Sequence, residues 1–382
     1  MDIKQFSINA SGKLVKMPAG YWAFIPNELP PRLEYTPRLV MALAEAERGL
    51  GELRGVSEGL TDARLLLRPF IQMEAVLSSR IEGTRASLED LLIFEGTQLA
   101  LFEENRDVRE VQNYVNALEY GLERIKDLPV SLRLIKEIHA QLMEGVRGEG
   151  LQPGEFRTRQ NWIGTAGATL EDATYVPPPP EEMKKALGEL EEFLNQASEI
   201  PALFKLGMAH YQLEAIHPFA DGNGRMGRLL IVLMMSAWEL LPRPVLNLSA
   251  AFEAERQSYY QHLLAVSQGG EWEEWLVYFL DGIKQESRRA IQRIKALEGL
   301  RDRYMEVIRK ERADERLSQA VNALFSSPIL TVRQMGKQLG ISYLAAERCM
   351  QRLIELGLLR EITGKARNRI YQADAILKAL NE

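Results

Sequence analysis

The sequence predicts an all-α fold that carries one small β-hairpin and ends in a helix–turn–helix unit followed by two short strands. Apolar residues recur at three- and four-residue spacing along most of the chain, which is the period of an amphipathic helix. Alternating patterns that are typical of strands are rare. Residues 160–180 differ from the rest, because glycines and then four prolines interrupt the helical period there.

Nine helices are expected from the period, and the intervening segments contain the residues that end helices. Residues 21–33, YWAFIPNELPPRL, predict an extended arm before the first helix, since proline cannot continue a helix. The short alternating stretch in residues 160–177 predicts a small surface hairpin. The expected helices are 36–60, 63–82, 106–126, 130–144, 180–199, 201–216, 224–240, 252–268 and 270–313.

The C-terminal part, residues 315–382, has a different organisation. TVRQMGKQLGIS predicts a short helix, a turn and a serine N-cap, and a second helix then runs to Gly357. REITGKARNRIYQA predicts two strands around a basic turn, so this part is similar to a winged helix.

Charge leaves the role of that part open. Between Ser327 and Glu382 there are nine lysines and arginines against five acidic residues, about +4, whereas the whole chain carries −6. Winged helices bind DNA in some families and bind protein partners in others, and both alternatives stand. On DNA, the cations expected to face the phosphate backbone are Arg348, Arg352, Lys365, Arg367 and Arg369.

Composition points to a cytoplasmic protein without a membrane span. The single cysteine, Cys349, cannot form an internal disulfide and suits a reducing compartment. The first residues, MDIKQFSINASGK, lack the apolar segment of a secretory signal. The longest apolar run, LLIVLMM, is far shorter than the ~20 residues that cross a bilayer.

The most informative stretch is HPFADGNGRMGR, from His217 to Arg228. Pro218, directly after His217, prevents the preceding helix from continuing. The GNGR segment leads into the next helix, whose N-terminal N–H groups can bind an anion. Arg225 and Arg228 add forked donors for phosphate oxygens, and the Asn223 side chain can donate to the same anion.

Two further groups in the stretch have no place in a simple anion site. A carboxylate beside phosphates, Asp221, is reasonable if it holds a divalent cation such as Mg²⁺. The imidazole of His217 can accept a proton from an attacking hydroxyl near neutral pH. Together these groups predict transfer of a nucleotide's phosphorus-centred group to a hydroxyl.

These twelve residues resemble the full signature of the Fic (filamentation induced by cAMP) family, His-Pro-Phe-x-(Asp/Glu)-Gly-Asn-Gly-Arg-x-x-Arg, with every defined position present. Residues 21–33, 135–164 and 248–280 extend the likeness over about residues 20–290. The resemblance implies an N-terminal segment over residues 1–105, a helical catalytic core over 106–300, and transfer of AMP from ATP to a Ser, Thr or Tyr hydroxyl of a target protein.

The resemblance also implies roles for single residues. His217 would be the base, Asp221 would bind Mg²⁺, and Trp162, Ile163 and Gly164 would form the flap that holds the target segment as an added strand. ATP would be bound by Gly222, Asn223, Gly224, Arg225, Met226, Gly227 and Arg228, the last on the γ-phosphate, with Gln212, Tyr259 and Tyr260 near the adenine.

Some positions fit this scheme less well. Core packing explains the two tyrosines equally well, and Glu255-Arg256 stands where relatives often carry Asn-Arg. His139 and His210 match no catalytic position and are expected to be structural.

A second motif suggests regulation. Ser78-x-x-x-Glu82-Gly83 resembles the inhibitory motif (Ser/Thr)-x-x-x-Glu-(Gly/Asn) that precedes many Fic cores. Ser78 and Glu82 share one helical face, and Gly83 can end the helix. If this helix packs over the nucleotide site, Glu82 pairs with Arg228 and repels the γ-phosphate. The same glutamate could instead position a water that removes AMP from a modified protein.

Other functions fit the same residues. Related proteins move UMP, phosphocholine or phosphate, and the chain could also be a DNA-binding regulator whose core senses a nucleotide. A homodimer through the helical core is compatible with the pattern. The target protein, its modified residue and the balance between addition and removal of AMP are open at this level.

Overall fold

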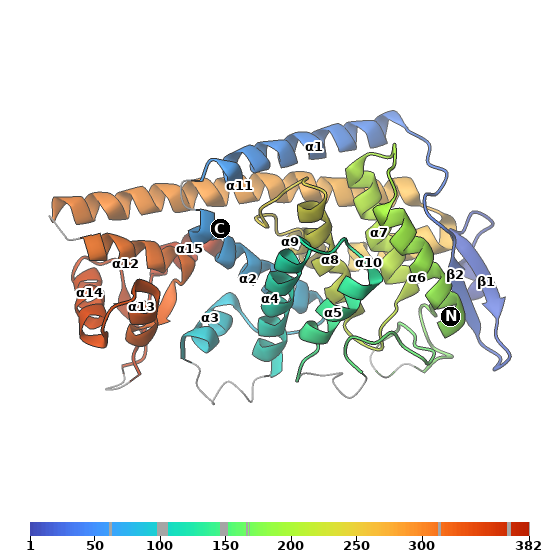
Figure 1. Cartoon of the computed structure of the whole chain (residues 1–382). Helices are drawn as coiled ribbons and strands as arrows, with labels where there is room; N and C mark the ends of the chain where they lie inside the picture. Colours follow the sequence, from blue (N-terminus) through green and yellow to red (C-terminus); the bar gives the residue numbers. More distant parts are fainter. Residues whose placement is uncertain are drawn as a thin grey trace.

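The computed structural model describes residues 1–60, 63–97, 106–145, 152–165, 167, 169–311, 315–364 and 368–381. The fold is mostly helical, as the sequence predicts, with two small antiparallel sheets. The long helix α11 (Trp272–Lys310) runs along one side of the molecule, and α1 (Pro37–Glu58) lies beside it (Figure 1). No helix in the described ranges is both long and apolar enough to span a bilayer.

The remaining helices of the large helical part pack beneath this pair (Figure 1). They are α2 (Ala63–Ile81), α3 (Leu88–Thr97), α4 (Arg106–Arg124), α5 (Leu132–Leu142), α6 (Pro180–Asn195), α7 (Ala202–Ile216), α8 (Asn223–Ala237), α9 (Ser249–Ala254) and α10 (Arg256–Gly269).

Helices α7 and α8 form the centre of the core. All residues of α7 except Ala202 and Glu214 are buried, and α8 is buried from Arg225 to Met235. A helix that is buried all round belongs in the middle of a protein. The loop of residues 217–222 that joins these two helices is therefore anchored at both ends in buried helices of the core.

The N-terminal segment differs from the expected extended arm. Strands β1 (Gly12–Lys16) and β2 (Trp22–Pro26) form an antiparallel hairpin, with Gly12 opposite Pro26 and Lys16 opposite Trp22. Strand β2 could not be predicted from the sequence, because four of its five residues are buried. Its apolar residues are therefore continuous, and the alternating pattern that predicts a strand is missing. Helix α3 was also not predicted, and the helix expected over 252–268 is divided between α9 and α10 at Glu255.

The C-terminal unit consists of residues 315–381 as described. Its elements are α12 (Glu315–Ser326), β3 (Ile329–Thr331), α13 (Val332–Leu339), α14 (Tyr343–Glu355), β4 (Arg360–Glu361), β5 (Ile370–Gln372) and α15 (Asp374–Asn381), with strand order β3–β5–β4. Thr331 and Gln334 form a capping box on α13, and Ser342 caps α14. Elements α12, β3 and α15 were not expected.

Two observations bear on the cations considered for DNA. Arg352 is already paired with Glu355 and Glu311, so one expected phosphate contact is occupied within the unit. Lys365 and Arg367, in the expected basic turn, lie outside the described residues.

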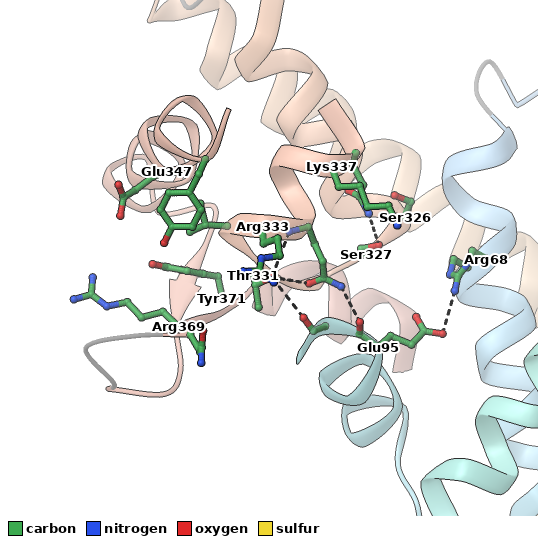
Figure 2. A pocket seen from close by; sticks show the side chains of 16 residues that line it. Arg68, Glu95, Ser326, Ser327, Thr331, Arg333, Lys337, Glu347, Arg369 and Tyr371 are labelled. Atoms are coloured by element: carbon green, nitrogen blue, oxygen red, sulfur yellow. Dashed lines mark hydrogen bonds and ion pairs between the residues drawn. The ribbon is translucent and has the colours of Figure 1, made fainter. Parts of the chain in front are cut away.

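The C-terminal unit contacts the helical core at α2, α3 and α11, and Figure 2 shows its contact with α3. The Gln334 amide donates to the carbonyl of Glu95, 3.0 Å away, while the Glu95 carboxylate accepts from Arg68 and Gln72 of α2. An open crevice of about 670 Å³ lies beside this contact. Glu95 thus connects the C-terminal unit to the helix that carries Ser78.

Candidate active site

The loop between α7 and α8 enters and leaves through left-handed backbone conformations. His217 caps the C-terminus of α7 with φ 50° and ψ 61°, and Gly222 caps the N-terminus of α8 with φ 78°. A non-glycine residue at positive φ is uncommon and is often found at functional sites. A Cβ atom on Gly222 would lie 2.7 Å from the sulfur of Met143, so this position also needs glycine for space.

Asn223 closes the loop from within. Its Oδ1 accepts the N–H of Phe219 and its Nδ2 donates to the carbonyl of the same residue, both at 2.8 Å. This differs from the expectation that the side chain of Asn223 faces an anion. Its role in this structure is to hold Phe219, and with it the curvature of the loop.

The catalytic candidate His217 has a defined proton position. Its Nδ1 lies 3.3 Å from the carbonyl oxygen of Glu214, which can only accept, so Nδ1 carries the proton and Nε2 has the free lone pair. Burial lowers the pKa of His217 to about 4. The imidazole is therefore neutral at pH 7 and able to take a proton at Nε2.

The start of α8 carries the anion-binding groups. Its first N–H groups have no acceptor within the helix, and no side chain caps it at Gly222. The positive end of the helix dipole favours a negative charge there. A Cβ atom on Gly224 would overlap Oε1 of Glu82, so the carboxylate of Glu82 lies against the backbone of this helix start.

Glu82 also pairs with Arg228, which lies one turn further along α8. The Arg228 guanidinium is buried and donates from Nη2 to Oε1 of Glu82 at 2.7 Å. It donates to Ser78 as well, from Nε to Oγ at 2.9 Å and from Nη2 to the carbonyl at 3.0 Å. Burial alone would raise the pKa of Glu82, but the charge of Arg228 and its hydrogen bond lower it below the ordinary value.

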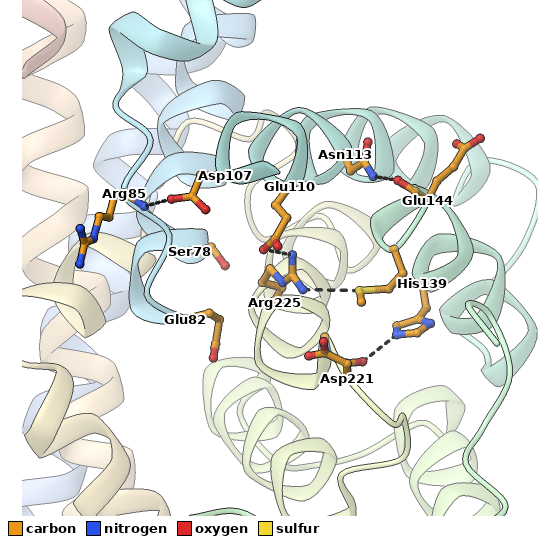
Figure 3. A network of polar contacts seen from close by, with 12 residues as sticks. Ser78, Glu82, Arg85, Asp107, Glu110, Asn113, His139, Glu144, Asp221 and Arg225 are labelled. Carbon is orange, nitrogen blue, oxygen red and sulfur yellow. Dashed lines mark hydrogen bonds and ion pairs between the residues drawn. The ribbon is translucent and has the colours of Figure 1, made fainter. Parts of the chain in front are cut away.

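The end of α2 brings these residues to the site. Ser78 lies in the last turn of α2, Glu82 follows the helix, and Gly83 turns the chain away with φ +97°. The N–H of Arg85 is then held by Asp107 of α4 at 2.8 Å (Figure 3). The segment is therefore fixed on both sides of Glu82.

Arg225 has a partner that the sequence did not indicate. Its guanidinium donates to Glu110 of α4 at 2.9 Å, and the two side chains are 1% and 4% exposed (Figure 3). A buried pair of this kind is costly to separate. The Arg225 side chain thus anchors α8 to α4, and its contribution to ATP binding stays a prediction.

Asp221 lies directly before the helix start. Its Oδ1 accepts the N–H of Gly222 at 2.7 Å, and its backbone carbonyl accepts from His139 at 3.0 Å. Within the described ranges, no three His, Cys, Asp or Glu residues gather as a metal site.

The residues predicted near the adenine separate into two groups. Tyr260 is 40% exposed, and the guanidinium of Arg256 lies 5.9 Å from the centre of its ring. Tyr259, in contrast, is fully buried, and its hydroxyl forms a hydrogen bond of 2.8 Å with Nε2 of His210. Gln212 is buried and donates to the carbonyl of Asn27 at 2.9 Å. Its amide holds the N-terminal segment, and its expected place near the adenine stays a prediction. Met226 is buried as well.

Gly227 contributes space instead of a hydrogen bond. A Cβ atom there would overlap Oε1 of Glu214, a buried oxygen with no partner among the described residues. Burial raises the pKa of Glu214 to about 7. The two glycines of α8, Gly224 and Gly227, therefore make room for two carboxyl groups beside Arg228.

The predicted flap lies next to His217. Trp162, Ile163 and Gly164 are all exposed, and Ile163 forms an antiparallel bridge with Tyr175, its N–H donating to the Tyr175 carbonyl at 2.8 Å. Ala166 and Ala168, in the expected turn, lie outside the described residues.

Arg157 ties the flap to the catalytic loop, and its charge alone did not distinguish it in the sequence. Its buried guanidinium donates from Nε to the carbonyl of His217 at 2.9 Å and from Nη2 to that of Pro178 at 2.6 Å. Burial lowers the pKa of Arg157 to about 10, which leaves it charged at pH 7.

Replacing Arg157 with alanine should therefore loosen both segments. Each buried carbonyl that loses its donor costs about 1–3 kcal/mol, so we expect the urea midpoint of unfolding to fall clearly. The Arg159→Ala variant removes an exposed arginine two residues away and is the matched control. Equal midpoints for the two variants would contradict this role of Arg157.

Comparison with known protein families gives two matches. The model described as Fic/DOC family N-terminal matches residues 40–123, and the Fic/DOC family model matches residues 129–235. The chain is similar to the protein adenylyltransferase Fic of Drosophila grimshawi, with 27% identity over 202 residues, 52% of this chain and 37% of that protein. The corresponding protein of Aedes aegypti is 31% identical over 189 residues, 49% of this chain and 34% of that protein.

Solved structures show the same fold. A Fic family protein from Desulfovibrio desulfuricans G20 superposes with a TM-score of 0.58 at 21% identity, covering 90% of this chain and 98% of that one. Fic-1 (aa134–508) from C. elegans superposes with a TM-score of 0.53 at 23% identity, covering 68% of this chain and 74% of that one. The chain spans about a third of the length of the curated relatives that it matches.

Proposed function

The chain belongs to the Fic/DOC family, and on this premise we propose that it is a protein adenylyltransferase, an enzyme that transfers AMP from ATP to a hydroxyl side chain of a target protein. One observation carries the proposal. A neutral imidazole with its lone pair on Nε2 opens the loop that leads into α8, and a carboxylate, that of Glu82, lies against the start of this helix.

The reaction follows from these two features. The target hydroxyl gives its proton to Nε2 of His217 while its oxygen bonds to the α-phosphorus of ATP. The bond from the α-phosphorus to the oxygen bridging the β-phosphorus breaks, and pyrophosphate leaves. The N–H groups at the start of α8 stabilise the negative charge on the phosphates, and Arg228 binds the γ-phosphate once Glu82 has left it.

Asp221 fits a magnesium ion bound with the nucleotide. One of its oxygens accepts the N–H of Gly222, and no hydrogen bond or ion pair within the described residues occupies the other. Mg²⁺ on a nucleotide is usually held by one or two carboxylates together with phosphate oxygens and water, so a lone carboxylate at this place suits it. The ion would offset the charge of the phosphates.

We propose that Glu82 inhibits the enzyme. Its carboxylate lies at the helix start and on Arg228, where the γ-phosphate would bind, and like charges repel. ATP that enters with Glu82 in place would have to bind with its α-phosphate displaced from His217, which prevents in-line attack. Removal of AMP from a modified target is a second activity open to the same site, because the carboxylate of Glu82 also faces the space beside the helix start.

The exposed flap is the proposed docking place for the target. Trp162, Ile163 and Gly164 present an exposed segment one residue beyond Asn161, whose Nδ2 donates to the carbonyl of Phe219 at 2.9 Å. An extended target segment added beside these flap residues would carry its hydroxyl toward His217.

Labelled ATP distinguishes this proposal from transfer of other groups. We expect the Glu82→Gly variant, mixed with soluble cell proteins, to label polypeptides from ATP carrying ³²P in the α-position and not from ATP carrying it in the γ-position. Label from the γ-position would show phosphate transfer instead. Label from α-labelled UTP but not from ATP would show that the base preference is different.

A further inference from the structure

A second histidine, His139 of α5, lies directly beneath the catalytic loop. It is 3% exposed, and its ring stacks on Phe219 with a centroid distance of 3.6 Å and an interplanar angle of 5°. Its two nitrogens contact two different segments, at Gly154 and at Asp221, and Figure 3 shows the contact with Asp221. These contacts agree with the expected structural role of this residue and connect it to the catalytic loop.

The contacts fix the tautomer of the ring. Gly154 can only donate its backbone N–H, which lies 2.9 Å from Nδ1, so Nδ1 is unprotonated. The carbonyl of Asp221 can only accept, and Nε2 lies 3.0 Å from it, so Nε2 carries the hydrogen. The neutral Nε2–H form is the one that satisfies both contacts.

The ring also limits what the loop can contain. A Cβ atom on Gly222 would lie 3.3 Å from Nε2 of His139 and 2.7 Å from the sulfur of Met143. The peptide between Asp221 and Gly222 is therefore held between the imidazole, which binds its carbonyl, and the start of α8.

We propose that His139 is a positioning residue that sets the orientation of the Asp221 carboxylate and of the first N–H groups of α8. The hydrogen bond to the Asp221 carbonyl fixes the peptide from which both the carboxylate and the N–H of Gly222 project. The bond from Gly154 links the same ring to residues 152–157, which lead into the flap. This inference rests on the proposed role of Asp221 in binding the magnesium nucleotide.

Two substitutions separate positioning from packing. His139→Phe keeps the stack on Phe219 and removes both hydrogen bonds. His139→Gln keeps an amide donor for the Asp221 carbonyl. Residues that orient metal ligands typically change metal affinity or activity by about 10- to 100-fold, so we expect His139→Phe to raise the Mg²⁺ concentration for half-maximal AMP transfer within that range and His139→Gln to restore part of it.

The measurements are made on the full chain in the Glu82→Gly background. His262→Phe is the control, because His262 stacks on Tyr278 away from the loop, and it should leave the Mg²⁺ requirement unchanged. If the Glu82→Gly parent labels no protein, the proposed function fails. If the parent labels protein and His139→Phe has the Mg²⁺ requirement of the parent, the positioning role alone fails.

A second readout does not depend on activity. The chain has four histidines, and the ¹⁵N spectrum of histidine-labelled protein, assigned with His139→Gln, reports the tautomer of each ring. We expect His139 as a single Nε2–H tautomer. An Nδ1–H signal, or an average of two tautomers, would overturn the inference.

Discussion

The His217→Ala variant should transfer AMP about 10²- to 10⁴-fold more slowly than its parent, because a positioned general base typically contributes that factor. The structure directs Nδ1 of His217 to the Glu214 carbonyl, which leaves the lone pair of Nε2 able to accept a proton. Alanine removes the base and leaves the anion-binding groups of α8 in place. The measurement is incorporation of α-labelled ATP in the Glu82→Gly background, where the parental rate is highest.

Nucleotide binding distinguishes loss of the base from loss of the site. Calorimetry should show that His217→Ala still binds ATP with Mg²⁺ at an affinity close to that of its parent. The control His262→Ala alters a histidine outside the loop and should keep the parental rate. A His217→Ala rate equal to that of the control would remove His217 from the mechanism.

Glu82→Gly should raise AMP transfer by about 10- to 100-fold. A hydrogen bond to a charged group is worth about 1.5–3 kcal/mol, which corresponds to roughly that range in binding, and Glu82 makes such a bond to Arg228 at 2.7 Å. Once it is removed, the γ-phosphate meets an arginine that Ser78 still holds in place. The rate of label incorporation from ATP into protein is the measurement.

Two further variants test whether the increase in AMP transfer is specific to the charge of Glu82. Glu82→Gln keeps the length of the side chain and removes its charge, and should give a large part of the increase. Glu89→Gly alters an exposed glutamate in the first turn of α3 and should give none. If Glu82→Gly has the rate of the unaltered protein, the contact with Arg228 is not inhibitory.

Local chemistry explains what the sequence could predict about the site. Pro218 and the glycines around Asn223 fix where one helix ends and the next begins, so the position of the loop and of the helix start followed from the residues themselves. The four-residue spacing of Ser78 and Glu82 likewise placed both on one helical face, and both contact Arg228 in the structure.

Long-range partners could not be predicted in the same way. Arg225 pairs with Glu110, 115 residues away, and Arg157 donates to four carbonyls. His139 accepts a hydrogen bond from Gly154 and donates one to the carbonyl of Asp221. Burial of these polar side chains depends on how distant helices pack. The hairpin β1–β2 was missed for a related reason, because β2 is covered on both faces and lacks an alternating pattern.

A crystal structure of the Glu82→Gly variant with a non-hydrolysable ATP analogue and Mg²⁺ tests the central claim most directly. The account predicts the triphosphate on the first N–H groups of α8, the γ-phosphate on Arg228 in the place of the Glu82 carboxylate, and the α-phosphorus open to a hydroxyl beside Nε2 of His217. A triphosphate bound elsewhere, or an α-phosphate turned away from His217 in the absence of Glu82, would contradict it.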